Sequence, residues 1–346
     1  MEKAVNNEAP VAFVKGSVTV KERAIPIVST RLSWRDVVGG WKVRWDIGRM
    51  RYRVRPGLYG VGSPSPESPV LVTANYKLTF DRLRRELEGI DAWILVLDTR
   101  GINVWCAAGK GTFGTRELEQ RILAVRLDQV VSHRTLILPQ LGASGVAAHE
   151  VKEATGFRVK YGPVMARDIP AYLAAGLKKV DAMRAVPFRL GDRMAIAPAE
   201  LMHAWPFLLA ILAGSALLSL PFAAGYLHRF LGFFIPLVGA VLLATLGFPA
   251  LLPFLPFRAF ALKGAVLGAL WSVLAAFILQ TSLPGGAAMV LMTTPLVAFI
   301  AMNFTGASTF TCQPGAALEV RLGTIPMIAS LVIGVGLAIT ARILSL

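Results

Sequence analysis

Residues 101–115, GINVWCAAGKGTFGT, hold the side chains with the clearest chemical potential. Cys106 is one of only 2 cysteines in the chain, and it directly follows Trp105. The small residues Ala107 to Gly109 then leave the backbone open to a large, flat molecule. The cysteine could serve as a nucleophile, as a single axial metal ligand, or as an inert packed residue.

Other chemistries fit this stretch poorly. The pair Gly109-Lys110 suggests a phosphate-binding loop, which requires G-x-x-x-x-G-K followed by Ser or Thr. Val104 and Gly111 occupy two of its fixed positions, so the match fails. A redox disulfide, a zinc site or an iron–sulfur site would need further cysteines, and the first half of the chain has none.

Charge divides the chain into two unlike halves. The first 200 residues carry 31 basic and 20 acidic side chains, whereas the remainder carries 5 basic and 1 acidic. The second half holds about five apolar stretches, each near the ~20 residues that cross a bilayer: roughly 204–226, 232–255, 259–280, 286–306 and 324–344. We therefore expect an all-α transmembrane domain of about five helices over residues 203–346, after a linker at 181–202, in a multi-pass protein of the cell (inner) membrane.

The start of the chain and its prolines bear on topology. The opening MEKAVNNEAP is polar, which predicts no signal peptide and a cytoplasmic first half. Five spans would place Arg258, Lys263 and Arg321 on the cytoplasmic side. Four prolines between residues 236 and 256 indicate that the second stretch is broken or re-entrant.

The net charge of +15 raises the question of partners. Basic residues are scattered and form no recognised nucleic-acid motif, so we do not expect the chain to bind nucleic acid. We expect its positive charge to interact with the anionic headgroups of the lipid bilayer. Cys106 and Cys312 lie in different halves of a chain that faces a reducing compartment, which predicts no structural disulfide.

Residues 1–69 are expected to form an irregular segment that packs on the next domain. Aromatic and basic residues alternate along residues 34–60, and a Pro/Ser-rich stretch follows them. The aromatic–basic run could bind a polyanion. Packing against the domain, or lying on the membrane surface, is the favoured interpretation.

From residue 70 to 180 the pattern becomes regular. Apolar runs near 69–74, 92–98, 134–139 and 157–162 predict strands, and the segments near 78–89, 115–130, 142–156 and 166–176 predict helices. This alternation indicates a Rossmann-like α/β domain, in which a parallel sheet carries helices on both faces.

Ligands of such sheets lie beyond the carboxyl ends of the strands. The segment around Cys106 follows the second predicted strand, so it should lie over this edge. The same rule selects the residues that end or follow the strands: Thr73, Ala74, Asp98, Pro139, Leu141, Gly142, Ala143, Tyr161 and Gly162.

Residues 103–110, NVWCAAGK, resemble the cap-helix signature of the HgcA family, the corrinoid proteins of microbial mercury methylation. That family is related to the corrinoid subunits of the CO dehydrogenase/acetyl-CoA synthase pathway. The resemblance continues through PGLYGVGSPSPESPVLVTANYKLTFD and LPQLGA, and the apolar half is similar to the family's membrane region.

The resemblance implies a corrinoid (cobalamin-type) cofactor with the Cys106 thiolate as the lower axial ligand of its cobalt. Thr73 and Thr79 would contact the corrinoid. The alternative role for each threonine is a helix cap or a turn hydrogen bond, and Thr79 in particular could be an N-cap. The rest of the signature would shape the cap beneath the corrin ring: Asn103, Val104, Trp105, Ala107, Ala108, Gly109 and Lys110. The D-x-H-x-x-G motif of other cobalamin modules is absent, so His133 and His149 are expected to be ordinary histidines.

The resemblance also implies an activity and partners. A methyl group would pass, carbanion-like, from methyl-Co(III) to Hg(II), giving methylmercury. An iron–sulfur protein, HgcB, would supply electrons, and a methyltetrahydrofolate-dependent pathway would supply the methyl group. Two alternatives stay open: a membrane-bound methyl carrier of one-carbon metabolism, and a non-catalytic membrane receptor or transporter.

Overall fold

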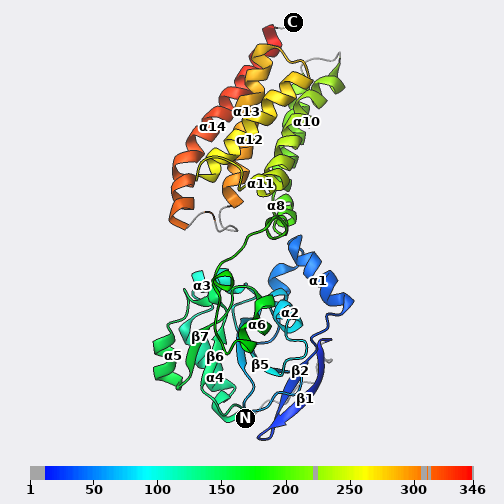
Figure 1. Ribbon diagram of the computed structural model, residues 1–346. Coiled ribbons are helices and arrows are strands. Elements are labelled where there is room, and N and C mark those ends of the chain that lie inside the picture. Colours follow the sequence, from blue (N-terminus) through cyan, green and yellow to red (C-terminus); the bar gives the residue numbers. More distant parts are fainter. Residues whose placement is uncertain (1–11, 221–224, 305–309, 311–312, 345–346) are drawn as a thin grey trace, which may run out of the picture. The chain divides into compact units, whose positions relative to one another are not determined.

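The structure is a computed structural model that describes residues 12–220, 225–304, 310 and 313–344. The chain forms two compact units, one of residues 1–43 and 47–186 and the other of residues 44–46 and 187–346. The first unit holds every strand of the described sheet, and the second is helical (Figure 1).

A seven-stranded sheet organises the first unit, in the order β1-β2-β3-β5-β4-β6-β7. The four strands predicted from the sequence pair in parallel: β4 (Val70–Ala74), β5 (Ala92–Leu97), β6 (Thr135–Leu138) and β7 (Arg158–Tyr161). Three earlier strands extend the sheet: β1 (Val14–Val20), β2 (Arg23–Val28) and β3 (Gly57–Val61). β1–β2 and β3–β5 pair antiparallel, so the predicted α/β class is confirmed, with a mixed, mostly parallel sheet.

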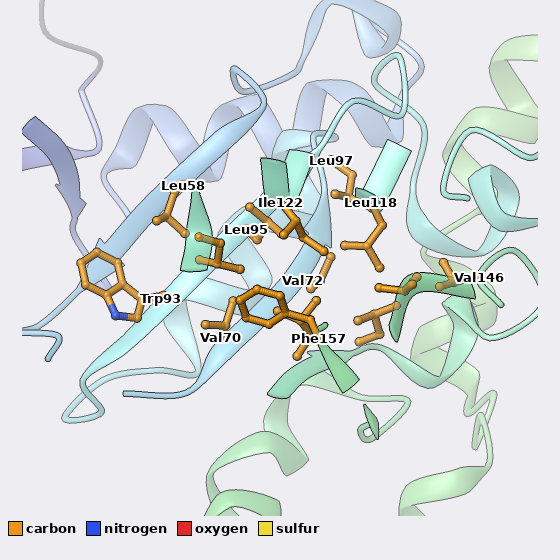
Figure 2. Packing of buried hydrophobic residues seen from close by; sticks show 14 of the residues in the cluster. Leu58, Val70, Val72, Trp93, Leu95, Leu97, Leu118, Ile122, Val146 and Phe157 are labelled. Atoms are coloured by element: carbon orange, nitrogen blue, oxygen red, sulfur yellow. The ribbon is translucent and has the colours of Figure 1, made fainter. Parts of the chain in front are cut away.

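Both faces of the sheet are covered because the central strands are apolar along their whole length. In β5, Trp93, Leu95 and Leu97 join the core beneath helices α4 (Thr115–Ala124) and α5 (Ala148–Thr155) (Figure 2). The alternate residues, such as Ile94 and Val96, join a second core beneath α2 (Lys77–Arg85) and α6 (Ile169–Ala174). This period-two alternation is what a strand buried on both faces requires.

The expectation of an irregular N-terminal segment is wrong for the described part of residues 1–69. That part supplies β1, β2, β3 and helix α1 (Trp34–Arg44), so it belongs to the sheet and does not merely pack on it. Its basic residues obscured the strand pattern. β1 lies at the edge of the sheet, where one side of a strand can face water and apolar runs are short.

A buried cluster of charges joins α1 to α2. Asp36 on α1 accepts hydrogen bonds from Lys77 and from Arg84 Nη2, the latter at 2.9 Å. Asp81 accepts from Lys77 Nζ at 2.6 Å and from Arg84 Nε at 2.8 Å. Two carboxylates therefore face two cations, which is how buried charges avoid an uncompensated loss of hydration.

The second unit consists of helices, with these bounds: α7 (Leu190–Met194), α8 (Ala197–His203), α9 (Trp205–Ser219), α10 (Tyr226–Leu242), α11 (Phe248–Leu251), α12 (Phe260–Ile278), α13 (Leu283–Asn303) and α14 (Gln313–Leu344). Within the described residues, 4 helices are long and apolar enough to cross a membrane, or 5 if a bent pair counts as one span. The predicted helical region with about five candidate spans is thus confirmed, and its place in a membrane and its orientation remain predictions.

The break in the helical unit differs from the predicted one. Residues Tyr226–Leu251 form one continuous candidate span in which a π-helical stretch, η6 (Leu243–Gly247), absorbs the irregularity. The sharp bend of 49° lies earlier, between Leu190–His203 and Trp205–Ser219, and part of it falls in the predicted linker. Pro236 stays inside α10. Prolines are tolerated in apolar helices of this kind because neighbouring groups can satisfy the backbone carbonyl that the proline frees.

Candidate functional site

The predicted signature folds into a short helix, α3 (Val104–Gly109), after β5. Val104, Ala107 and Ala108 recur at helical spacing and are buried in the core between the sheet, α4 and α5. Trp105, Cys106 and Gly109 lie on the other side of the helix, where Trp105 and Gly109 are exposed and Cys106 is half-buried. The signature therefore divides into an anchoring face and an outward face that carries the thiol.

Local hydrogen bonds fix both ends of α3. The side chain of Asn103 is its N-cap and accepts a hydrogen bond from the Cys106 backbone N–H at 2.9 Å. At the other end Lys110 is the C-cap, and Gly111 follows with φ of +77°, in the left-handed region that favours glycine. Gly109-Lys110-Gly111 is thus the exit turn of α3.

Asn75 positions the approach to α3, and it was not among the residues predicted from the sequence. Its side-chain oxygen accepts hydrogen bonds from Thr99 Oγ1 at 2.9 Å and from the Thr99 and Gly101 backbone N–H groups at 3.1 and 2.9 Å. Its amide donates to Asp98 Oδ1 at 3.0 Å. One indication of this role was present in the sequence, because Asn75 is a polar residue that directly follows the buried strand β4.

The loop after β6 packs directly against the α3 region. It contains the short helix η3 (Gln140–Gly142), and a Cβ on Gly142 would lie 2.5 Å from the Phe113 ring. A Cβ on Gly145 would lie 2.2 Å from Phe113 O and 3.0 Å from Ala108 Cα. The predicted residues Leu141 and Gly142 of η3 therefore lie against the α3 region, Ala143 follows them, and the missed Gly145 makes the closest approach.

The remaining strand-end residues lie nearby but mostly serve the scaffold. Tyr161 Oη donates to Val146 O at 2.6 Å, and burial raises the pKa of its phenol. Gly162 N donates to Leu138 O at 2.7 Å and so continues the β6–β7 pairing. Both residues fix the loop that presents Gly145 to α3.

The two predicted threonines do not converge with the α3 face. Thr73 is only 2% exposed, and strand alternation places its side chain on the α2 side of the sheet, opposite the core that anchors α3. Thr79 is half-buried inside α2, whose N-cap is Tyr76, so the alternative that Thr79 caps this helix is wrong. Contact of either threonine with a ligand remains a prediction.

The structure offers few other metal donors. His133 Nδ1 accepts from the Thr135 N–H at 3.2 Å while its Nε2 lies 2.9 Å from Ser68 O, which is a structural role. His149 is an exposed side chain on α5. Within the described ranges, no three His, Cys, Asp or Glu side chains converge to hold a metal ion. A metal bound at α3 would have Cys106 as its protein ligand and would need other donors from a larger molecule.

These features define a class: a mostly parallel α/β ligand-binding domain, with a cysteine-bearing helix at its carboxyl edge, on a chain with 4 to 5 candidate membrane spans. Residues 47–173 match the family described as CdhD, CO dehydrogenase/acetyl-CoA synthase delta subunit. The match begins in the segment ahead of residue 70, in agreement with the inclusion of β3 in the sheet. This domain is therefore related to the CdhD family.

Curated relatives support the same relationship. The chain is 35% identical over 131 residues to the acetyl-CoA decarbonylase/synthase complex subunit gamma of Methanopyrus kandleri, covering 37% of this chain and 28% of the relative. It is 32% identical over 127 residues to the subunit of the same name from Archaeoglobus fulgidus, covering 36% and 27%. It is 31% identical over 159 residues to the corrinoid/iron-sulfur protein large subunit of Moorella thermoacetica, covering 45% and 33%. The chain thus spans about a third or less of each relative's length.

Proposed function

We propose that this chain is a membrane-anchored corrinoid methyltransferase whose cofactor binds at the carboxyl edge of the sheet. The observation that carries the proposal is the outward face of α3, which presents the half-buried Cys106 beside exposed Trp105 and Gly109. Such a cofactor would supply a cobalt centre for the transfer of a methyl group from a donor to an acceptor. The similarity to a protein named corrinoid/iron-sulfur protein supports this choice of cofactor.

The donor set of the site fits such a cofactor. A bare metal ion would need about four protein ligands, but α3 offers one sulfur, and no other cluster of metal-binding side chains occurs in the described residues. A corrin ring brings four nitrogen ligands of its own, so a single protein ligand is sufficient. A Cβ added to Gly109 would meet nothing within 4 Å, which leaves room for a flat ring over the helix.

The residues of the chain would hold and tune this ligand. The thiol of Cys106 loses its proton when it coordinates a metal, and the soft anionic sulfur donates electron density to it. Asn103 and Asn75 fix the position of the thiol, because they bind the first turn of α3 and the loop that precedes it. Val104 and Ala107 bury the opposite side of the helix, so the thiol cannot rotate into the core.

The proposed acceptor is Hg(II), and the product is methylmercury. The Cys106 thiolate would donate electron density to the bound metal, which would favour transfer of the methyl group, with its bonding electrons, to an electrophile such as Hg(II). The choice of mercury rests on the resemblance of Asn103–Lys110 to the HgcA signature. An HgcB-like ferredoxin would supply electrons, and a methyltetrahydrofolate-dependent pathway would supply the methyl group.

A second candidate is a membrane-bound methyl carrier of one-carbon metabolism. The names of the relatives favour it, since they refer to acetyl-CoA decarbonylase/synthase complexes. Both candidates use the same thiolate and differ only in the acceptor.

The test compares the full-length wild type with Cys106→Ala, each purified in detergent with cobalamin. Cys312→Ala is the matched control, because it is the same chemical change at the other cysteine. The absorption spectrum of the bound corrinoid and methyl transfer to Hg(II), with a ferredoxin as reductant, are measured. Cys106→Ala should shift the spectrum and lower the transfer rate by at least ~100-fold, the upper range for loss of a supporting group at a metal site.

Three other results would change the proposal. An unchanged spectrum and rate in Cys106→Ala would exclude thiolate ligation. Absence of any corrinoid spectrum in the wild type would favour a receptor or transporter. Ligation by Cys106 with methyl transfer only to a carbon acceptor, and none to Hg(II), would select the methyl carrier.

A further inference from the structure

Helix α1 exposes large apolar side chains on one face. Trp34, Val37 and Trp41 follow helical spacing and are 73%, 59% and 60% exposed. Ile47 and Met50, in the turns that follow, are 53% and 60% exposed. We refer to these five side chains as the α1 face. A group of this kind is unusual on a water-exposed surface and marks a contact surface.

The orientation of the α1 face is fixed from the opposite side of the helix. Asp36 is tied into the buried charge cluster with Lys77 and Arg84. The glycines of α1 allow close packing: a Cβ on Gly39 would lie 2.6 Å from Tyr52 Oη, and one on Gly40 would lie 3.2 Å from Leu78 Cδ1. The helix cannot roll to bury its tryptophans without breaking these ion pairs and contacts.

The charge around the α1 face is strongly positive. Residues 31–55 contain 8 Arg and Lys side chains and 2 acids, Asp36 and Asp46. Asp36 is buried among its cationic partners, and Asp46 is exposed with one carboxylate oxygen 3.1 Å from His203 Nε2. Arg35 and Lys42 lie on α1 itself and are exposed. A surface of this charge complements an anionic one.

The chain itself supplies a reason to choose lipid as the occupant. The α/β unit ends at Val186, and the candidate spans begin with the bent pair at Leu190. At ~3.5 Å per residue, the short connection keeps this domain within roughly some tens of Å of a bilayer. Such a tether raises the effective concentration of the lipid surface at the α1 face.

We infer that the α1 face inserts into the headgroup region of an anionic bilayer. Tryptophan favours the membrane–water interface because its ring is apolar and its N–H remains hydrogen-bonded there. Arg35 and Lys42 flank the apolar side chains and pair with lipid phosphates. The inference is independent of the corrinoid and of the methyl acceptor.

A spin label reports the depth of the α1 face in the full chain. Val37→Cys is made in a Cys106→Ala/Cys312→Ala background, labelled with a nitroxide, and placed in nanodiscs of phosphatidylglycerol or phosphatidylcholine. Glu153→Cys on α5 is the matched control, because Glu153 is also exposed but lies on another surface. Power saturation compares access of oxygen, which enters lipid, with access of a water-soluble nickel complex.

The label at residue 37 should be shielded from nickel and open to oxygen in phosphatidylglycerol, while the label at residue 153 stays open to nickel. Adding Arg35→Gln and Lys42→Gln should lower the ratio of shielded to open label about fivefold per charge removed. Equal nickel access at residues 37 and 153 in both lipids would overturn the inference. Shielding at residue 37 that needs an added ferredoxin would assign the α1 face to a protein partner and overturn it as well.

Discussion

Buried charged side chains have different partners in the two units. In the α/β unit, Asp36 and Asp81 face Lys77 and Arg84, so each buried charge has partners of opposite sign. The cluster spans α1 and α2 and carries no net charge. Such pairing fixes the relation of two helices because displacement of either helix would leave a charge unpaired.

In the helical unit, buried cations bind backbone carbonyls. Arg193 donates from Nε to Pro249 O at 2.7 Å and from Nη2 to Ala250 O at 3.2 Å. Lys263 donates from Nζ to Leu252 O at 2.8 Å. These carbonyls lie at the end of α11, where the last turn of a helix has no intrahelical donors.

The difference shows which buried polar groups need partners in each unit. The α/β unit has formal charges to neutralise, whereas the helical unit has a helix end to cap among apolar helices. A cation suits that task because the carbonyl end of a helix carries partial negative charge. Loss of one cation should therefore cost more in the α/β unit, where it leaves a full charge behind, than in the helical unit, where it leaves a neutral carbonyl.

The largest effect is expected for Arg84→Met. It leaves Asp36 and Asp81 with Lys77 as their shared cation, and breaking a buried ion pair costs about 3–5 kcal/mol. The free energy of unfolding can be measured by urea denaturation of the full chain in a sugar detergent, with pulse proteolysis reporting on the α/β unit. Arg85→Met is the control, because Arg85 is exposed and pairs only with its neighbour Glu86 among the ion pairs described. This change should alter the free energy of unfolding by less than about 0.5 kcal/mol.

A quadruple variant separates charge from packing in the same cluster. Asp36→Leu, Lys77→Met, Asp81→Leu and Arg84→Met together remove every charge and should recover much of the stability lost in Arg84→Met. Equal instability in the quadruple variant would show that shape, and not charge balance, holds α1 to α2.

The next effect is expected for Asn75→Ala, which removes the hydrogen bonds of the Asn75 side chain in the same unit. It leaves the Thr99 and Gly101 N–H groups unpaired in a buried position, at about 1–3 kcal/mol each. Hydrogen exchange of residues 99–109, read by mass spectrometry, should quicken. Gln120→Ala, an exposed change on α4, should leave this exchange unaltered; if it quickens the exchange equally, the effect of Asn75 is not local.

A smaller effect is expected for Lys263→Met in the helical unit. It leaves Leu252 O without this donor but removes the buried charge with it, so we expect a loss of about 1–2 kcal/mol. Thermal unfolding in detergent should show a modest fall, and the exposed Arg258→Met should show almost none. A loss as large as that of Arg84→Met would contradict the comparison between the two units.

The parts of the fold that were predictable from sequence are those with strong periodicity. The four parallel strands, their helices and the apolar helices follow directly from runs of one pattern. β1, β2 and β3 were missed because basic residues lie in or beside them, namely Lys15, Lys21, Arg23 and Arg55. β1 also lies at the edge of the sheet, where a strand does not demand apolar residues on both faces. The place of these strands in the sheet depends on their pairing with one another and with β5, which no local pattern shows.

The position of the candidate site in the fold could be predicted from the sequence, whereas most contacts of its residues could not. The strand-end rule placed the segment around Cys106 beyond the second predicted strand, and the structure shows that Val104, Ala107 and Ala108 form the buried side of α3, opposite Trp105 and Cys106. Sequence alone did not show this division because helix α3 is only 6 residues long and follows an irregular loop. Asn75 and Gly145 were missed since their roles arise from loops that meet only after the sheet forms.

The last prediction concerns the response of the charge cluster to acid. The contribution of Asp36 to the free energy of unfolding should not change near neutral pH and should fall only at low pH. Burial opposes ionisation of Asp36, but hydrogen bonds and the charge of Lys77, with hydrogen bonds from Ser33, outweigh it and hold the pKa of this carboxyl well below its usual range. A lowered folded-state pKa gives stability that is complete above the unfolded pKa of about 3.9 and is lost as pH falls toward the folded value. The wild type should therefore show no change from this group between about pH 5 and 8 and a steep loss below about pH 4. Asp36→Asn, less stable at neutral pH, should lose less on acidification; parallel curves for the two proteins would assign the acid response to other carboxyls.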